Sequence, residues 1–337
     1  MSSTLHGFGL GIASENAQGD ILDVFFPDPR VNISGELADI LSQVSGTLDT
    51  SALDELSNAC KKAGDEALVK LTERLRDSGC RVVAATLVSN TAPETVGEAY
   101  LKLHMLSHRL VKPHGTDLTG IFPLLPNVAW TDEGAIDLSE LAERQLTSRL
   151  KGKILEVSSV DKFPKMTNYV VPSGVRIAHS ARVRLGAHLG AGTTVMHEGF
   201  INFNAGTEGP GMVEGRISAG VMVGKGSDLG GGCSTMGTLS GGGNLIISVG
   251  EECLIGANAG LGIPLGDRCT VEAGLFVTAG TKVTVLDDQR NTIETLAARH
   301  LAGRSDLLFR RNSQSGSVEC LTNQTAIELN ESLHANN

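Results

Sequence analysis

The sequence lacks any run of about 18 uncharged apolar residues, the shortest stretch that spans a membrane as a helix. The amino-terminal stretch MSSTLHGFGLGIASENAQGD also lacks the basic start and the apolar segment of a signal peptide. These absences argue against an integral membrane protein and against a secreted one. We therefore expect a cytoplasmic protein that does not act at a membrane.

Cysteine pairs with metal-binding or redox spacing are also missing, because none of the six cysteines forms a CxxC motif. We expect all six to be reduced, buried fillers of the core. His179, His188 and His197 follow one another at intervals of nine residues but show no carboxylate-histidine ligand pattern, so no metal ligands are assigned. The cysteines are Cys60, Cys80, Cys233, Cys253, Cys269 and Cys320.

Positive charge is too scarce for a nucleic-acid-binding face, since the formal net charge is -10 at pH 7. Small anionic ligands are compatible with this balance, because local groups of arginine and lysine can bind them. The candidates for such contacts are Arg176, Arg182, Arg184, Arg216, Lys282 and Arg290.

What the sequence does contain is a six-residue repeat. A branched aliphatic residue recurs at every sixth position, and a small residue follows it four positions later. This period indicates a β-solenoid rather than an ordinary parallel sheet or sandwich. The aliphatic positions are Ile177, Val183, Leu189, Val195 and Ile201, then Ile217, Val223 and Leu229, then Leu265, Val271, Val277 and Val283.

In such a coil each six-residue side is a short strand whose aliphatic side chain points into a narrow bore. The small residue lies near a corner, where bulk would clash and where glycine can take a positive φ. Three sides make one turn, and successive turns stack about 4.8 Å apart through backbone hydrogen bonds. We therefore predict an α+β protein with a left-handed parallel β-helix of the hexapeptide-repeat family.

The pattern divides the chain into four predicted segments. Residues 1–110 form an α/β amino-terminal domain, 111–168 a small middle α/β domain, 169–288 the β-helix, and 289–337 a carboxy-terminal cap and tail. Hydrophobic periodicity predicts the main elements outside the coil. They are strands at 4–11, 21–26, 81–88, 127–131 and 153–158, helices at 52–77, 92–110, 138–150 and 291–300, and two strands within 307–321.

The middle segment, with a helix between two strands, is compatible with a βαβ crossover. Two interruptions of the repeat, 207–216 (TEGPGMVEGR) and 239–245 (LSGGGNL), break the six-residue register. Insertions cannot enter a packed coil, so we expect both to leave it as extruded loops.

Several blocks of the sequence are more specific than generic hexads. They include MHEGF at 196–200, MVEGRISAG at 212–220, LIGANAGLGIPLGD at 254–267 and VEAGLFVTAGTKV at 271–283. Upstream, LHMLSHRLVKPHG at 103–115 and VDKFPKMTNYVVPSGVRI at 160–177 fit the same pattern. Together they resemble tetrahydrodipicolinate N-succinyltransferases of the actinobacterial type over most of residues 100–330. The amino-terminal domain matches more loosely, chiefly in HGFGL and DVFFP.

The resemblance implies a reaction and an assembly. Members of this family succinylate the amino group of acyclic tetrahydrodipicolinate, using succinyl-CoA, in the diaminopimelate branch of lysine biosynthesis. The family forms homotrimers with the active site in a groove between neighbouring coils, and a Mg²⁺ on the trimer axis is compatible with it. No nucleic acid or membrane is implied.

Glu198 is the predicted catalytic residue, both by the resemblance and because a carboxylate occupies a corner position that is normally small or polar. It could take the amine proton, or attack the thioester and form a mixed anhydride. His197 competes for the catalytic role, since histidine often serves as a base, and otherwise positions Glu198 or the substrate. Glu214 is a further carboxylate, for which we favour a structural role.

Substrate and donor contacts are also predicted. Arg216 is expected to bind a carboxylate through its planar guanidinium. A backbone N–H within 218–220 is expected to stabilise the thioester oxyanion, because small side chains allow close approach. Predicted contacts to the CoA donor are Gly215, Ser218, Gly220, Gly241, Ala257, Asn258, Ala273, Gly280 and Lys282, with Lys282 near phosphate or adenine.

Other functions are compatible with the repeat itself, since one fold supports different chemistries. Another CoA-dependent N- or O-acyltransferase of the same architecture is the first alternative. A non-catalytic scaffold is the second, although it would not need MHEGF beside an interruption. A carbonic-anhydrase-like lyase is disfavoured, because the sequence shows no histidine triad with metal-binding spacing.

Overall fold

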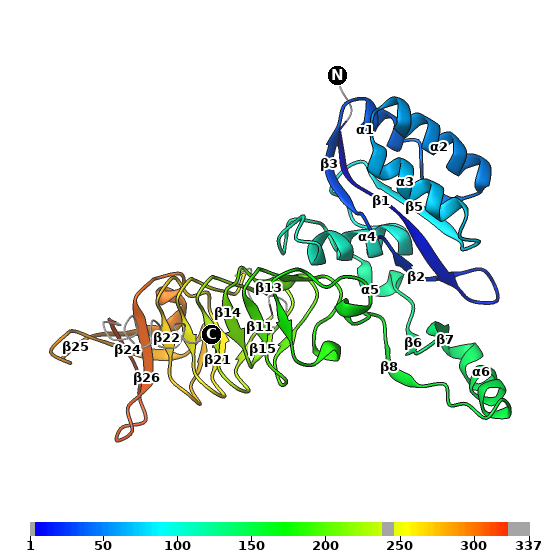
Figure 1. Cartoon of the computed structure of the whole chain (residues 1–337). Helices are drawn as coiled ribbons and strands as arrows, with labels where there is room; N and C mark the ends of the chain where they lie inside the picture. The colour runs from blue at the N-terminus through cyan, green and yellow to red at the C-terminus, as the bar shows by residue number, and fades with distance from the viewer. Residues whose placement is uncertain (1–3, 238–245, 323–337) are drawn as a thin grey trace. The chain divides into compact units, whose positions relative to one another are not determined.

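The computed structural model describes residues 4–237 and 246–322 of the 337 (Figure 1). Contacts divide the chain into two compact units, residues 1–111 with 115–164 and residues 112–114 with 165–337. The finer division into four segments stays a prediction. Within the described residues, no helix has both the length and the apolar character required to cross a bilayer.

The first unit is built on an antiparallel sheet with strand order β2-β1-β5-β4, and β3 also pairs with β1. The strands expected at 4–11, 21–26 and 81–88 are confirmed as β1, β2 and β5. The strands are β1 (Thr4–Glu15), β2 (Ile21–Phe25), β3 (Arg30–Ser34), β4 (Gly46–Leu48) and β5 (Val82–Leu87). The helices are α1 (Glu36–Leu41), α2 (Thr50–Lys62), α3 (Glu66–Arg76) and α4 (Val96–Ser107).

The long strand β1 carries different residues on its two faces, because side chains alternate along a strand. Phe8 and Leu10 belong to the core that includes buried residues of α1, α2 and α3. Gly7 and Gly9 face the other way, where a Cβ would press on Met105 and Leu101 of α4. The glycines therefore allow α4 to lie close against the sheet.

The helix predicted at 52–77 is two helices, and that prediction was wrong. Gly64 takes a φ of +76°, which ends α2. The carboxylate of Asp65 then accepts a hydrogen bond from the Leu68 N–H at 3.0 Å and caps α3. The apolar spacing continues through the break, so periodicity alone did not reveal it. The helix expected at 92–110 is α4, and the Thr95 hydroxyl caps it by accepting a hydrogen bond from the Glu98 N–H at 3.1 Å.

Replacing Asp65 with alanine should lower the free energy of unfolding by about 1–3 kcal/mol, because it removes both a helix cap and a partner of a half-buried arginine. Burial raises the pKa of Asp65, but hydrogen bonds from Arg30 and the Leu68 N–H outweigh this and hold the pKa below its usual range. Urea unfolding followed by circular dichroism measures the loss. Asp65→Asn, which keeps a capping oxygen but not the charge, should lose less, and equal losses would contradict the capping argument.

Residues 115–164 hold a short helix, a small sheet and a longer helix. The helix predicted at 138–150 is confirmed as α6, but the βαβ crossover is wrong. Strand β6 lies between β7 and β8 and is antiparallel to both. A hairpin strand that the sequence analysis missed precedes the helix, so β8 returns antiparallel and begins later than predicted. The elements are α5 (Ile121–Leu124), β6 (Val128–Thr131), β7 (Gly134–Asp137), α6 (Leu138–Leu150) and β8 (Val157–Asp161).

The second unit is a coil of stacked parallel strands, seen in Figure 1 as the successive turns that run from green to orange. The strands form three sheets. The first holds β9 (Arg176–Ile177), β11 (Thr193–Val195), β14 (Gly211–Val213), β17 (Asp228–Leu229), β20 (Leu254–Ile255) and β22 (Thr270–Val271). The second holds β12 (Phe200–Ile201), β15 (Arg216–Ile217), β18 (Ser234–Thr235), β21 (Gly260–Gly262) and β23 (Phe276–Thr278). The third holds β10 (Ala187–Leu189), β13 (Ala205–Thr207), β16 (Met222–Val223) and β19 (Ser248–Val249).

Most of the predicted aliphatic positions line the bore, although Ile177 in the first turn is only partly buried. Val195 and Ile201 are fully buried, as are their counterparts in later turns. Val213, which the predicted repeat did not include, is also fully buried. Burying one such side chain contributes about 1.5–3 kcal/mol, so the column holds the turns together. Short 3₁₀ helices lie at Met166–Asn168 (η1), Ser180–Arg182 (η2) and Ala298–Leu301 (η3).

The first predicted loop, 207–216, does not leave the coil. Thr207 occupies a bore position in β13, and β14 pairs with β11 and β17. The register breaks instead at one corner. Val195 pairs with Val213, 18 residues later, whereas Ile201 pairs with Ile217, 16 residues later. One turn is therefore two residues shorter than the turn above it. The second predicted loop, 239–245, lies outside the described residues.

The carboxy-terminal residues continue the first sheet. The hairpin predicted within 307–321 is confirmed as β26 (Leu307–Arg311) and β27 (Val318–Thr322), and β26 pairs in parallel with β22. The helix predicted at 291–300 is mostly wrong, because β25 (Thr292–Ala297) pairs antiparallel with β24 (Lys282–Leu286) and only a 3₁₀ turn follows. Among the cysteines, Cys80 is exposed, contrary to expectation, and the other five are buried.

Candidate functional site

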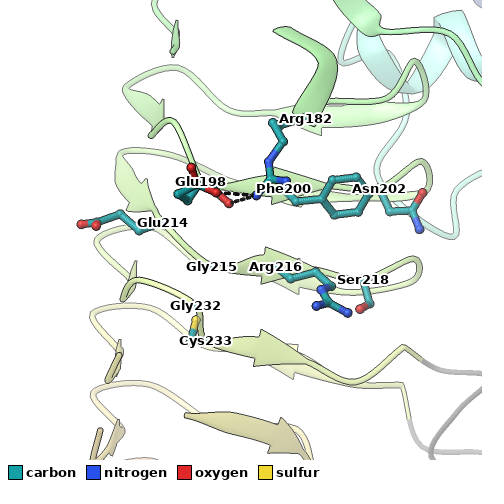
Figure 2. Close-up of a pocket in the computed structure, with 10 residues that line it drawn as sticks. All are labelled: Arg182, Glu198, Phe200, Asn202, Glu214, Gly215, Arg216, Ser218, Gly232 and Cys233. Atoms are coloured by element: carbon teal, nitrogen blue, oxygen red, sulfur yellow. Dashed lines mark hydrogen bonds and ion pairs between the residues drawn. The ribbon is translucent and has the colours of Figure 1, made fainter. Parts of the chain in front are cut away.

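A recess of about 650 Å³ lies on the side of the coil, where the shortened turn meets its neighbours. The corner above it has four residues, 196–199, and the shortened corner has two, Glu214 and Gly215. Because the shorter corner projects less, side chains from the turns above and below border a hollow. The lining residues are Arg182, Glu198, Phe200, Asn202, Glu214, Gly215, Arg216, Ser218, Gly232 and Cys233 (Figure 2).

Glu198 is held by two neighbours at the upper rim. Its carboxylate lies 3.2 Å from Nη2 of Arg182, and that nitrogen also donates to the Glu198 carbonyl at 2.6 Å. The other carboxylate oxygen lies 2.8 Å from Nδ1 of His197. The hydrogen bond from His197, followed by the charge of Arg182, lowers the pKa of Glu198. Glu198 is therefore an ionised, 71% exposed carboxylate at neutral pH.

Glu214 is the second carboxylate of the recess. It lies on the shortened corner of the coil. From the sequence it had been expected on a loop outside the coil. In Figure 2 its side chain points away from Arg216, whereas Glu198 turns toward Arg182. Half-buried Glu214 follows Val213 at the position where the six-residue spacing fails. This failure of the six-residue spacing is the sequence signal that could have identified Glu214 as a stronger candidate for the catalytic role.

Gly215 and Ser218 line the recess with Arg216, but part of their role is structural. A Cβ on Gly215 would overlap the sulfur of buried Cys233, so packing alone requires glycine there. The Ser218 N–H donates to the Thr235 hydroxyl at 3.1 Å, and the Gly220 N–H donates to the Asn204 carbonyl at 2.9 Å. Both backbone donors are occupied within the coil.

The remaining predicted donor contacts do not line the recess. Ala257 and Asn258 lie on the corner between β20 and β21, and Ala273 lies on the next corner of the same edge. Gly280 and Lys282 belong to a different corner, at the start of β24. Gly220 is also not among the lining residues, and its carbonyl oxygen lies 2.8 Å from Nε2 of His114. Gly241 lies outside the described residues.

Four lining residues were missed by the sequence analysis, and one of them is Cys233, which was expected only as a filler of the core. Phe200 and Asn202 occupy the two outward positions that flank a bore residue of β12, and Gly232 lies on the corner below the shortened one. Of the six basic candidates for anion binding, Arg182 and Arg216 border the recess. Arg176, Arg184, Lys282 and Arg290 are not among its lining residues.

The three-sided coil of stacked parallel strands, with a polar recess at one corner, is the architecture of the hexapeptide-repeat proteins. Residues 246–279 match the family model for the hexapeptide repeat of succinyl-transferase, and residues 125–165 match that for the middle region of tetrahydrodipicolinate N-succinyltransferase. The chain is 64% identical to the 2,3,4,5-tetrahydropyridine-2,6-dicarboxylate N-succinyltransferase of Pseudomonas paraeruginosa over the full length of both. It belongs to the family of tetrahydrodipicolinate N-succinyltransferases and is an acyltransferase enzyme.

Two further comparisons agree. The enzyme of the same name from Vibrio cholerae is 57% identical over 98% of each chain. A crystal structure from Campylobacter jejuni, described as a 2,3,4,5-tetrahydropyridine-2-carboxylate N-succinyltransferase, is 33% identical with a TM-score of 0.88, covering 96% of this chain and 94% of that one. These relatives establish the family, and the actinobacterial subtype stays an expectation.

Proposed function

We propose that the chain transfers the succinyl group of succinyl-CoA to the amino group of acyclic tetrahydrodipicolinate, in the diaminopimelate branch of lysine biosynthesis. The observation that carries this is the recess, which combines two arginines with two carboxylates in a chain of this family. Arginine suits the carboxylates of the acceptor and of the succinyl group. The carboxylates suit proton transfer from an amine or attack on a thioester.

The reaction needs one bond to form and one to break. The neutral amine attacks the thioester carbonyl, a C–N bond forms, the amine loses a proton to a base, and the C–S bond breaks to release CoA as a thiol. Arg216 binds a substrate carboxylate in this proposal. Because the N–H groups of Ser218 and Gly220 are occupied, the Ala219 N–H is the member of this segment left to meet the oxyanion.

Glu198 is the proposed catalytic carboxylate, with His197 as its positioning neighbour. Its lowered pKa weakens it as a base and keeps it in the ionised form that a nucleophile requires. Glu214 borders the same recess without an ion pair to Arg182, so it is the competing candidate. The proposal keeps the predicted contacts to the CoA donor. They are those of Gly215, Ser218, Gly220, Ala257, Asn258, Ala273, Gly280 and Lys282.

The proposal includes a left-handed coil, a homotrimer and a cytoplasmic location. The family's hexapeptide repeat supports the hand of the coil, and the recess lies on the side of the coil, where a neighbouring copy could border it. Among residues 4–237 and 246–322, no group of three or more His, Cys, Asp or Glu side chains could hold a metal ion. A Mg²⁺ on a trimer axis would need ligands from three copies.

An assay of thiol release tests the function. Purified protein should release CoA from succinyl-CoA much faster with tetrahydrodipicolinate than without it, and faster than from acetyl-CoA. Release that does not depend on tetrahydrodipicolinate would reject the proposal. A preference for acetyl-CoA would favour another acyltransferase, and no release with any acyl donor would favour a scaffold.

A further inference from the structure

A short segment far from the coil in sequence is bound to its outer surface. Residues 112–114 belong to the second unit, although their neighbours on both sides belong to the first. The Lys112 ammonium lies 2.5 Å from the Glu208 carboxylate, and the His114 N–H donates to Oδ1 of Asn204 at 2.9 Å. Asn204 directly precedes β13 and Glu208 directly follows it, so the segment runs along the outside of this strand. We call residues 112–114 the strap.

His114, at the end of the strap, joins two turns of the coil. Its φ of +67° is a left-handed conformation that few non-glycine residues adopt and that only specific contacts maintain. Its backbone N–H bonds to Asn204, and Nε2 of its ring lies 2.8 Å from the carbonyl oxygen of Gly220, one turn further on. Because a carbonyl oxygen only accepts, Nε2 carries a proton and donates it.

This bond completes the hydrogen bonding of Gly220. Gly220 is buried, takes a φ of +85° and lies on the corner that follows β15. Its N–H donates to the Asn204 carbonyl at 2.9 Å, and its carbonyl accepts from the His114 ring. Both peptide groups of Gly220 are therefore fixed, and the direction of the neighbouring Ala219 peptide depends on them.

We propose that His114 is a positioning residue for succinyl transfer, because its ring fixes Gly220 and so directs the Ala219 N–H toward the thioester oxyanion. Ser218, on the same corner, lines the recess, whereas His114 does not. An oxyanion donor is effective only when it is preorganised, since turning it during the reaction would cost much of what its hydrogen bond contributes. The inference rests on the proposed function, because it concerns the oxyanion of that reaction.

Steady-state kinetics of His114→Asn test the inference. Asparagine tolerates a positive φ, so the strap keeps its backbone, but the shorter side chain does not reach Gly220. Removing an oxyanion donor lowers kcat by about 10²–10³-fold, so misdirecting one should lower it by at least about tenfold. The KM values for succinyl-CoA and tetrahydrodipicolinate should change by less than about twofold, because the bond acts on the transition state. A merely distorted binding surface would raise them.

Two matched variants separate the ring contact from other roles of the strap. His114→Gln should recover most of the rate, because the glutamine amide can donate to the Gly220 carbonyl from nearly the place of Nε2. Glutamine does not titrate, so this recovery would also exclude a general-base role. Lys112→Ala removes the other contact of the strap, an ion pair of an exposed lysine, and should leave kcat and both KM values unchanged.

A kcat of His114→Asn equal to that of the parent overturns the inference, and so does an equal loss in His114→Gln. Equal losses in Lys112→Ala and His114→Asn also overturn it, since docking of the whole strap would then be what the reaction requires. Circular dichroism checks that each variant is folded, and His114→Ala replaces His114→Asn with the same expectation if the latter is not. If the parent does not release CoA from succinyl-CoA in response to tetrahydrodipicolinate, the proposed function fails and this inference with it.

Discussion

Replacing Glu198 with glutamine is expected to lower kcat for succinyl transfer by about 10²–10⁴-fold, the range in which acid-base catalysis contributes. Glutamine keeps the size of the side chain and a hydrogen-bonding oxygen but can neither accept the amine proton nor attack the thioester. Because Glu198 is exposed at a corner and buries no apolar surface, the fold and the thermal midpoint should be unchanged. Thiol release under saturating substrates measures the effect.

The matched control is Glu214→Gln, on the neighbouring corner of the same recess. We expect it to retain more turnover than Glu198→Gln. The reverse order would transfer the catalytic role to Glu214, whose carboxylate is not paired with Arg182. His197→Ala separates a third alternative, because loss of a positioning contact should cost less than loss of the catalytic group. A His197 variant as impaired as Glu198→Gln would make the histidine the base.

Acid should destabilise the first unit well above the pH at which carboxylates titrate. His104 of α4 is fully buried, with Nδ1 at 2.8 Å from the Tyr100 carbonyl and Nε2 at 3.2 Å from the Phe26 N–H. A carbonyl only accepts and an N–H only donates, so the ring is neutral and carries its proton on Nδ1. Burial, together with the nearby His108, lowers the pKa of His104 to about 3.

The sign of the pH dependence follows from this lowered pKa. Between pH 6.5 and about 3 the unfolded chain binds a proton that the folded chain does not, so stability is complete above pH 6.5 and falls as the pH decreases. The loss approaches about 1.4 kcal/mol per pH unit, or roughly 2 kcal/mol between pH 6.5 and 5. Urea unfolding at a series of pH values measures the slope.

His104→Gln is the control, because glutamine can both donate and accept but does not titrate in this window. The His104→Gln variant should lose most of the dependence of the free energy of unfolding on pH between pH 6.5 and 5. Some slope should remain, since burial also lowers the pKa values of His6 and His108. An unchanged slope in His104→Gln would show that His104 is not the group that couples folding to pH.

The coil could be predicted from sequence because its core is local. Each bore residue, such as Val195 or Ile201, is specified by the six residues around it, and the same condition repeats at every side. Elements outside the coil were less predictable for the opposite reason. Residues 291–300 have a composition compatible with a helix, but pairing of β25 with β24 decides their conformation. In the same way, Gly64 ended a helix that the apolar spacing would have continued.

The site was partly predictable. Glu198 and Arg216 were named from the sequence, and both border the recess. The contact of Glu198 with Arg182 joins residues from adjacent turns, and no local motif indicates it. Phe200, Asn202 and Gly232 were missed because each is a residue type that also occurs at outward or corner positions of a coil without a site. Their part in the site depends on the shortened corner between them.

The sequence by itself determined the architecture and the family, because a hexad pattern and specific blocks such as MHEGF are properties of neighbouring residues. The tertiary structure decided where the site lies. Stacking converts a two-residue difference between corners into a recess and brings Arg182 to Glu198. This contact joins residues that are 16 apart in the chain but one turn apart in the coil, and only the folded register sets that distance.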